Sequence, residues 1–310
     1  MDDLNQIETA VRIEEFATIG FGEAASAFVL GLRQDATTLG FASYDIKTGA
    51  QDKAVVDRKL QDYAKAGVTA RADMASLLDG ATMVFSLVTA DQAQTAALEA
   101  AKSIPAGCYY FDGNSCAPKT KQANAAVIEA AGGRYVDTAI MSPVHPKLHK
   151  SPIILSGPWA DIAAEILTSL GMSATAEPGE VGRASSIKMV RSIMVKGLEA
   201  LVAECVLAGR LAGVEDYVLN SLEASYPGFG WKDRSAYNLE RMMAHGIRRA
   251  AEMREVEITV QDLGLPGDMA AATTNWQHLI GNLALSAKGD DYKTRADQIL
   301  TDMKMKEGEA

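Results

Sequence analysis

The stretch that decides the fold is "FATIGFGEAASAF", residues 16–28, an apolar run broken by two glycines that then continues as small and apolar residues. Gly20, Gly22 and Ala25 have the spacing GxGxxA, between an expected strand and an expected helix. The first glycine permits a tight turn, the second lets a pyrophosphate approach the backbone, and the small third residue lets helix and strand pack closely. Phosphates then lie on free N–H groups at the positive helix end. We predict a dinucleotide-binding turn with cofactor contacts at Gly20, Phe21, Gly22, Glu23, Ala24 and Ala25.

The glycine spacing needs support from its surroundings, because the tripeptide GFG recurs at 228–230 with no strand before it. A bare structural turn is therefore the alternative. Asp45 supplies support: it ends the next expected strand, at about the distance along the chain where such folds place a ribose-binding acid. A carboxylate accepts hydrogen bonds from ribose hydroxyls and repels a 2′-phosphate, so NAD is favoured. Lys47 would partly offset that repulsion, which keeps NADP as an alternative, and Glu23 would itself repel a pyrophosphate.

The hydrophobic pattern divides the chain into two parts. Apolar runs typical of strands alternate with helix-like stretches before Pro178, which favours parallel strands with crossover helices. Expected strands are 15–20, 39–46, 82–89, 107–112, 133–140 and 152–157, and expected helices are 52–66, 91–103 and 118–131. After Pro178 only helical spacing is prominent, at 183–212, 232–255 and 268–287. The predicted fold is α/β: a Rossmann-type doubly wound parallel sheet over 15–178, an all-α domain over 179–310, and an acidic extension over 1–14.

Composition narrows the classes of partner. The chain has 310 residues and a formal net charge of -10, and it has no basic run interleaved with aromatic residues, so nucleic acid is not expected. The start lacks the basic and apolar segments of a secretory signal, and no apolar run is long enough for a membrane span. Three scattered cysteines suit neither a disulfide framework nor a thiolate metal site. We expect a cytoplasmic protein without a membrane partner.

One helix of the second part carries polar residues on a single face. In "GEVGRASSIKMVRSIMVKGLEALVAEC", residues 179–205, Lys188, Arg191, Ser192 and Val195 recur at spacings of three and four. If this face lines a cleft between the domains, the neighbouring cation and partial burial favour the neutral amine of Lys188, the form that acts as a base. The alternative is a solvated helix face of ordinary charged residues.

Four motifs together carry a resemblance that covers nearly the whole chain. GxGxxA near the start, "FDGNSCAP" at 111–118, "VDTAIMSP" at 136–143 and "SIKMVRSIMVKGLEAL" at 186–201 occur in the order found in the β-hydroxyacid dehydrogenase and 6-phosphogluconate dehydrogenase superfamily. The last motif looks most like a little-characterised branch described as phosphogluconate-dehydrogenase-like. The resemblance implies an NAD(P)-dependent oxidoreductase acting on a small hydroxy acid or a related alcohol or aldehyde, and a homodimer.

The resemblance also implies roles for single residues. Lys188 falls on the superfamily's catalytic lysine, which takes the proton of the substrate hydroxyl while hydride leaves for the nicotinamide. Asn114 and Ser115 fall on the pair that holds the substrate carboxylate. The loop beside the nicotinamide corresponds to Val88 and Thr89.

Departures from the superfamily pattern put the substrate in doubt. Ser192 stands where an asparagine is usual, and Arg191 where phosphogluconate enzymes have a histidine. Val195 replaces the glutamate used in decarboxylation, which argues against that step. The Ser-Gly-Gly that lines the substrate site is replaced by residues 141–143, so the pocket is expected to differ. Arg191 and Ser192 are retained as candidate substrate contacts.

Other readings of the polar residues stay open. The loop "PVHPKLHK" at 143–150 is either plain surface or a wall of the pocket, and His145 is its candidate substrate contact. His145 and His149 have a metal-like spacing, but Pro146 and the lack of nearby ligands leave no metal expected. "GNSCA" at 113–117 approaches a nucleophile elbow, and Asp137 and His145 follow Ser115 in the order used by α/β hydrolases. An α/β hydrolase using Ser115 is therefore a rival enzyme class. A non-catalytic NAD(P)-binding sensor or scaffold is a further alternative.

Overall fold

The computed structural model describes residues 13–35 and 38–308. Most of the expected N-terminal extension therefore lies outside the described residues. The described chain divides into two compact units, Met1–Lys188 and Met189–Ala310. The boundary falls inside one long helix, ten residues after the composition boundary at Pro178.

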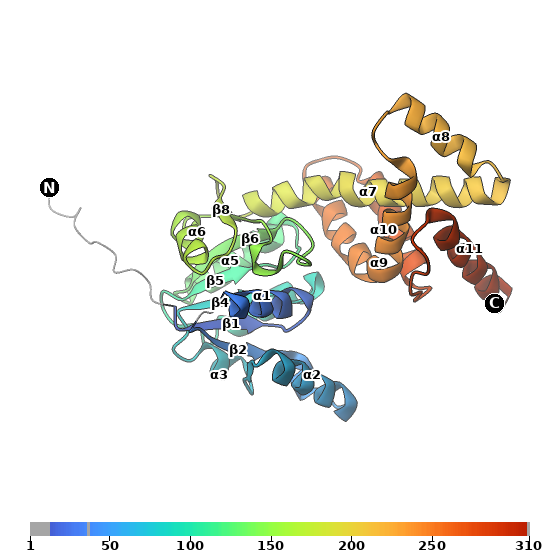
Figure 1. The fold of residues 1–310 in the computed structure, drawn as a ribbon. Coiled ribbons are helices and arrows are strands. Elements are labelled where there is room, and N and C mark those ends of the chain that lie inside the picture. The colour runs from blue at the N-terminus through green and yellow to red at the C-terminus, as the bar shows by residue number, and fades with distance from the viewer. Residues whose placement is uncertain (1–12, 36–37, 309–310) are drawn as a thin grey trace. The chain divides into compact units, whose positions relative to one another are not determined.

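The first unit is built on a single eight-stranded sheet (Figure 1). Its strands are β1 Glu15–Ile19, β2 Gly40–Tyr44, β3 Thr69–Ala70, β4 Met83–Ser86, β5 Tyr109–Asp112, β6 Arg134–Ile140, β7 Ile153–Ser156 and β8 Ala174–Ala176. The spatial order is β3-β2-β1-β4-β5-β6-β7-β8. The first six strands have the doubly wound order, in which the chain reverses its direction of growth between β1 and β4. The predicted Rossmann-type sheet is confirmed.

The pairing is parallel except at one position. β1 pairs in parallel with β2 and β4, with Ile19 beside Tyr44 and Ser86, so the carboxyl ends of these strands meet at one edge. β6 and β7 pair antiparallel, with Ile140 beside Ile153. The predicted parallel direction does not extend to β7, because the connection at residues 141–152 holds a 3₁₀ turn, η3 Leu148–Lys150, in place of a crossover helix.

Helices cover both faces of the sheet, so most strand residues are buried. These helices are α1 Glu23–Gln34, α2 Lys53–Ala66, α3 Met74–Leu78, α4 Ala93–Ala100, α5 Pro118–Ala130 and α6 Ala160–Ser169, with 3₁₀ turns η1 Ile46–Gly49 and η2 Ala90–Gln92. One core cluster joins α1, α2 and α6 to the sheet, and a second joins α3, α4 and α5 to its other face. Phe85 of β4 stacks between Phe16 and Phe111, with ring centroids at 5.2 and 4.7 Å.

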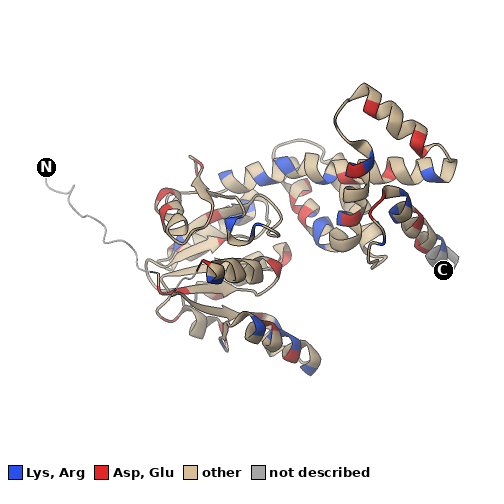
Figure 2. Ribbon diagram, in the orientation of Figure 1, with Lys and Arg blue, Asp and Glu red and all other residues tan. Residues whose placement is uncertain are grey.

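The described residues of the second unit form helices and the loops that join them, with no strand, as predicted. Its helices are α7 Arg183–Ala212, which starts in the first unit, α8 Glu215–Ser225, α9 Trp231–Asp262, α10 Asp268–Gly281 and α11 Tyr292–Gly308. α9 and α10 cross closely at Gly246 and Gly281, where a Cβ on Gly281 would lie 2.6 Å from the backbone nitrogen of Ile247. Figure 2 shows basic and acidic residues interspersed along α2 and α11. No helix in the described part of the chain combines the length and apolarity needed to cross a membrane.

Candidate active site

The glycine turn predicted from the sequence lies where the strand order reverses. Gly20 follows β1 with φ +83°, a left-handed conformation that favours glycine. Its N–H donates to the carbonyl of Tyr44 at 2.7 Å, which joins the turn to the end of β2. A Cβ on Gly20 would lie 2.8 Å from the Leu87 carbonyl oxygen and 3.0 Å from a Val88 methyl carbon. Only glycine therefore lets the loops after β1 and β4 come together at this edge.

The second glycine leaves open space at the start of a helix. Gly22 is the N-cap residue of α1, and a Cβ built there meets no atom within 4 Å. The first N–H groups of a helix have no acceptor within it and carry partial positive charge. The third position of the motif, Ala25, is fully buried in the core under α1. The open space at Gly22, the N–H donors in the first turn of α1 and the tightly packed Ala25 suit the pyrophosphate of a dinucleotide.

Asp45 is built into the turn as well as lying at the end of β2. One of its carboxylate oxygens accepts from the Phe21 N–H at 3.0 Å, and the other accepts from the Lys47 N–H at 3.0 Å. Lys59 of α2 donates to the Phe21 carbonyl at 2.6 Å and lies 3.8 Å from the Asp45 carboxylate. Asp45 therefore fixes the shape of the turn, and Lys59 offsets part of its charge.

The loops after β4 and β5 are held together by Asn114. Its side-chain oxygen accepts from the Val88 N–H at 2.7 Å, and its amide nitrogen donates to Ser86 Oγ at 2.9 Å and to Asp112 Oδ1 at 2.7 Å. Both amide protons are thus used within the protein, and the residue is buried. Asn114 therefore joins two loops, and its expected contact with substrate stays a prediction. Thr89 immediately follows the Val88 loop and precedes η2.

Lys188 and Ser115 are brought together by the fold. The Lys188 ammonium donates to Ser115 Oγ at 2.7 Å, although 73 residues separate them along the chain. Ser115 lies in the loop after β5, and Lys188 lies in the second turn of α7, and both side chains are half-buried. The structure thereby unites two predicted site residues at the carboxyl edge of the sheet.

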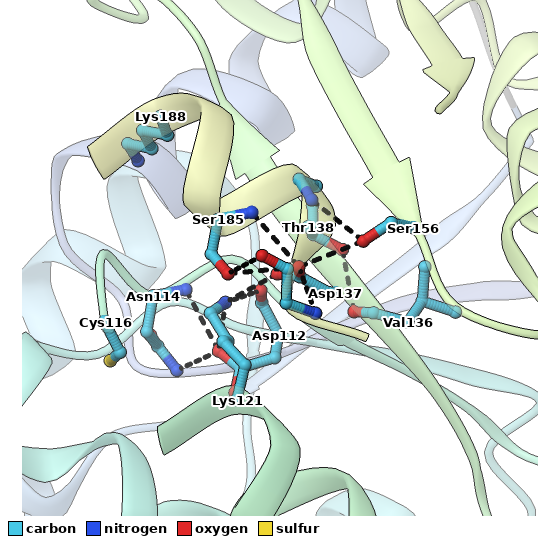
Figure 3. A network of polar contacts seen from close by, with 12 residues as sticks. Asp112, Asn114, Cys116, Lys121, Val136, Asp137, Thr138, Ser156, Ser185 and Lys188 are labelled. Carbon is cyan, nitrogen blue, oxygen red and sulfur yellow. Dashed lines mark hydrogen bonds and ion pairs between the residues drawn. The ribbon is translucent and has the colours of Figure 1, made fainter. Parts of the chain in front are cut away.

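The start of α7 is fixed by a strand carboxylate. Asp137 Oδ2, from β6, accepts from the N–H groups of Gly182 at 3.0 Å and Ser185 at 3.1 Å, and from Ser185 Oγ at 3.1 Å. Ser156 of β7 donates to the same oxygen and accepts from the Ala184 N–H at 2.9 Å. A negative charge at a helix N-terminus satisfies orphan donors and is favoured by the helix dipole. Lys188 follows Ser185 by three residues, about one turn along α7 (Figure 3).

A buried lysine lies between this carboxylate and a second one. Lys121 of α5 is fully buried and donates to both the carbonyl and the carboxylate of Asp112, the latter at 3.1 Å, and it lies 3.6 Å from Asp137 Oδ1. Asp112 also accepts from Asn124 at 3.0 Å and from the Tyr135 hydroxyl at 2.7 Å. Burial alone lowers the pKa of a lysine, but the Asp112 and Asp137 carboxylates outweigh it and raise the pKa of Lys121. Lys121 is therefore a cation in the folded protein.

Three further predicted site residues belong to other segments of the chain. His145 is exposed in the loop after β6, whereas the neighbouring His149 is buried and bonds Asp35 at 2.9 Å. Arg191 and Ser192 belong to the second unit, where Ser192 accepts a hydrogen bond from Lys196 at 3.1 Å.

The Ser–Asp–His set of a hydrolase is not assembled by these contacts. Ser115 accepts from Lys188, and the Asp137 carboxylate is engaged by Lys121 and the start of α7. Chemically, the Lys188–Ser115 pair can bind one oxygen of a small molecule and move a proton to or from it.

Sequence reasoning did not predict the roles that the structure gives to Asp112, Lys121, Asp137 and Lys59. A signal existed for the two aspartates, because a charged residue inside a buried strand such as "YYFD" or "RYVDTAI" requires a buried partner. For the two lysines no comparable signal existed. Each occupies an ordinary helical position, and only the tertiary fold shows that it is buried.

Comparisons with known proteins agree with this architecture. Residues 210–280 match a family model described as a domain of unknown function, DUF1932. A conserved hypothetical protein from Sinorhizobium meliloti 1021 is 32% identical, with 94% of this chain and 98% of that chain covered and a TM-score of 0.72. A conserved protein of unknown function, whose structure reveals similarity with 3-hydroxyacid dehydrogenases, is 27% identical over 86% of this chain and 99% of that chain, with a TM-score of 0.63.

More distant structures share the fold. The 3-hydroxyisobutyrate dehydrogenase from Mycobacterium tuberculosis, solved with L-serine, is 9% identical over 93% of this chain and 99% of that chain, with a TM-score of 0.68. Psf3, solved with NADP⁺ and 2-OPP, is 18% identical over 91% of this chain and 99% of that chain, with a TM-score of 0.62. The chain belongs to one family with the Sinorhizobium meliloti protein, within the β-hydroxyacid dehydrogenase and 6-phosphogluconate dehydrogenase superfamily.

Proposed function

We propose that the protein is an NAD(P)-dependent oxidoreductase that interconverts a small hydroxy acid, or a related alcohol, and the corresponding carbonyl compound. The observation that carries the proposal is the 2.7 Å contact between Lys188 Nζ and Ser115 Oγ, in the same unit as the glycine turn at Gly20. The solved structures of two 3-hydroxyisobutyrate dehydrogenases support the reaction type, since they share the fold. The substrate proposal rests on the superfamily resemblance.

The residues around the glycine turn would hold the dinucleotide. The open space at Gly22 and the first turn of α1 suit the pyrophosphate, and the Val88–Thr89 loop would lie beside the nicotinamide. Bound there, the nicotinamide supplies or accepts the hydride. NAD is our preferred cofactor because Asp45, buried at the end of β2, opposes a 2′-phosphate. NADP is the alternative, because Lys59 offsets part of that charge and a distant structural relative binds NADP⁺.

The protein's own chemistry is proton transfer at the substrate oxygen. In the oxidation direction, the neutral amine of Lys188 takes the hydroxyl proton and becomes an ammonium as the carbonyl forms. The Ser115 hydroxyl binds the same oxygen and keeps it in line with the amine. In reduction the ammonium returns the proton. General acid–base catalysis of this kind contributes about 100- to 10,000-fold to the rate.

The proposal is tested by turnover of the full-length protein. Small 2- and 3-hydroxy acids and primary alcohols are incubated with NAD⁺ or NADP⁺, and the matching aldehydes with NADH or NADPH, while absorbance at the reduced nicotinamide band is followed. We expect turnover of at least one hydroxy acid pair in both directions, with no release of CO₂. Saturable cofactor binding without any turnover would instead favour a sensor or scaffold, and cofactor-independent esterase activity lost on Ser115→Ala would favour a hydrolase.

We also propose that the protein is a homodimer that buries part of the second unit. Val190, Met194 and Leu201 are 49%, 72% and 59% exposed, and their spacing along α7 places them on one face. By the same helical geometry, that face is opposite to Lys188. Burying a large apolar side chain contributes about 1.5–3 kcal/mol, so such a stripe suits a partner subunit.

The dimer proposal predicts a change in molecular mass. Met194→Lys combined with Leu201→Lys places two cations on the stripe and is expected to give a monomer in light scattering coupled to size exclusion. Leu98→Lys, at a position in α4 that is 49% exposed, is the control and should leave the dimer intact. A wild-type monomer, or a dimer that persists in the double variant, would contradict the assignment of this face.

A further inference from the structure

The polar network beneath the active site connects both members of the Lys188–Ser115 pair. At one end, Asp112 accepts from the Asn114 N–H at 3.1 Å and from its side-chain amide at 2.7 Å. Asn114 directly precedes Ser115 in the chain and also binds the Val88 loop. The Asp112 carboxylate therefore fixes the loop that carries Ser115.

At the other end, Asp137 fixes the helix that carries Lys188. One oxygen of Asp137 binds the Gly182 and Ser185 N–H groups and the Ser185 hydroxyl. Its other oxygen has no hydrogen bond within the described residues and faces Lys121 Nζ at 3.6 Å. The two carboxylates thus meet through a single cation, Lys121, as Figure 3 shows.

Burying this cation needs an explanation beyond stability. Lys121, Asp112 and Asp137 have side chains that are 0% exposed, and removing charges from water costs several kcal/mol for each ion. Buried ion pairs can often be replaced by apolar residues of similar volume without loss of stability. What an apolar side chain cannot do is hold two carboxylates from neighbouring strands at a fixed separation.

We propose that Lys121 is a positioning residue, which ties Asp112 to Asp137 and thereby sets Lys188 Nζ against Ser115 Oγ. The effect of Lys121 on catalysis rests on the proposed function, whereas its effect on the position of Lys188 does not. Lys121 itself is fully buried in α5 and takes no part in proton transfer. The substrate oxygen is held correctly only while the loop after β5 and the first turn of α7 keep their spacing.

Three variants of the full-length protein separate this role from folding. Lys121→Met leaves two buried carboxylates facing each other without a cation. Asp137→Asn keeps an oxygen that can accept from the N–H groups at the start of α7, and it places an amide NH₂ group opposite Lys121. The double variant removes both members of the ion pair and leaves only the hydrogen-bonded Asp112 charge, so it should fold where Lys121→Met alone does not. Thermal unfolding identifies the variants that keep the native fold.

The first measurement does not depend on turnover. Each protein is treated with an amine-reactive reagent over a range of pH, and modification of Lys188 is quantified by mass spectrometry, with exposed Lys65 of α2 as the internal reference. In folded Lys121→Met or in the double variant, the profile of Lys188 modification should differ from the wild-type profile, because Nζ loses its contact with Ser115 Oγ. We expect Lys188 to be modified about tenfold faster relative to Lys65, as loss of one hydrogen bond to a charged group would allow.

The second measurement is kinetic and uses the substrate found by the turnover assays. The variants should lose kcat while KM and NADH affinity stay near the wild-type values, because the cofactor turn is untouched. A wild-type Lys188 profile in the folded double variant would overturn the proposal. Failure of every variant to fold would also overturn it, since the network would then serve stability. A shifted profile in a protein without turnover would sustain the positioning role and refute the proposed function.

Discussion

Lys188→Met is expected to lower turnover by about 100- to 10,000-fold, the contribution of a general base, while the affinity for NADH stays unchanged. Methionine has a similar length and no ionisable group, so the half-buried position stays filled but no proton can be accepted there. The affinity for the dinucleotide should not depend on this substitution, because Lys188 takes no part in the contacts of the Gly20 turn described above. Steady-state kinetics and an NADH titration on the same preparation measure the two effects.

Lys188→Arg tests whether turnover needs a base at this position or only a positive charge. Arginine keeps a cation and several donors close to Ser115 but does not give up a proton at accessible pH, so turnover should stay as low as in the methionine variant. Lys65→Met, at an exposed position of α2, is the matched control and should be as active as the wild type. Activity retained in both Lys188 variants would refute the role of Lys188.

The second large effect is expected at Gly22. In Gly22→Ala, the new methyl group enters space that the protein leaves open, at a φ of -102° that any residue adopts. The fold should survive with a loss of about 1 kcal/mol from the weaker N-cap. Crowding of a bound pyrophosphate costs about 1–3 kcal/mol, which is about ten- to a hundredfold in the dissociation constant for NADH. Fluorescence titration and thermal unfolding measure the two quantities separately.

Gly20→Ala provides the contrast. A Cβ there would meet the Leu87 carbonyl oxygen at 2.8 Å, and the φ of +83° is strained for alanine. This variant should lose binding and also much more thermal stability than Gly22→Ala. If Gly22→Ala binds NADH as tightly as the wild type, the pyrophosphate does not lie on this turn.

The fold could be predicted from the sequence where burial is strong. Strands such as β4 and β5 are buried along their whole length and appear as apolar runs. β3 has two exposed residues and β8 is three small residues only partly buried, so neither produces a recognisable pattern. β7 was predicted as a strand at 152–157, but its antiparallel direction was not, because its residues look like those of any buried strand. The direction of β7 follows from the connection at residues 141–152, which contains no crossover helix.

The candidate site could be predicted in part. The glycine turn has a spacing with a physical meaning. The resemblance assigned Lys188 and Ser115 to one site, and the structure brings the two side chains to 2.7 Å, while their roles stay predictions. For Asn114 the sequence could not show that its amide is used by Ser86 and Asp112. Lys121 had no signal, because its burial depends on two strands that only the folded sheet brings beneath α5.

The most direct test of the account is a titration of the purified wild-type protein with NADH and with NADPH, followed by nicotinamide emission and by quenching of protein fluorescence. The account predicts saturable binding of NADH in the micromolar range and weaker binding of NADPH. Tighter binding of NADPH would contradict the role given to Asp45 and leave the oxidoreductase proposal standing. Absence of saturable binding of either nucleotide would contradict the central claim that the turn at Gly20 holds a dinucleotide.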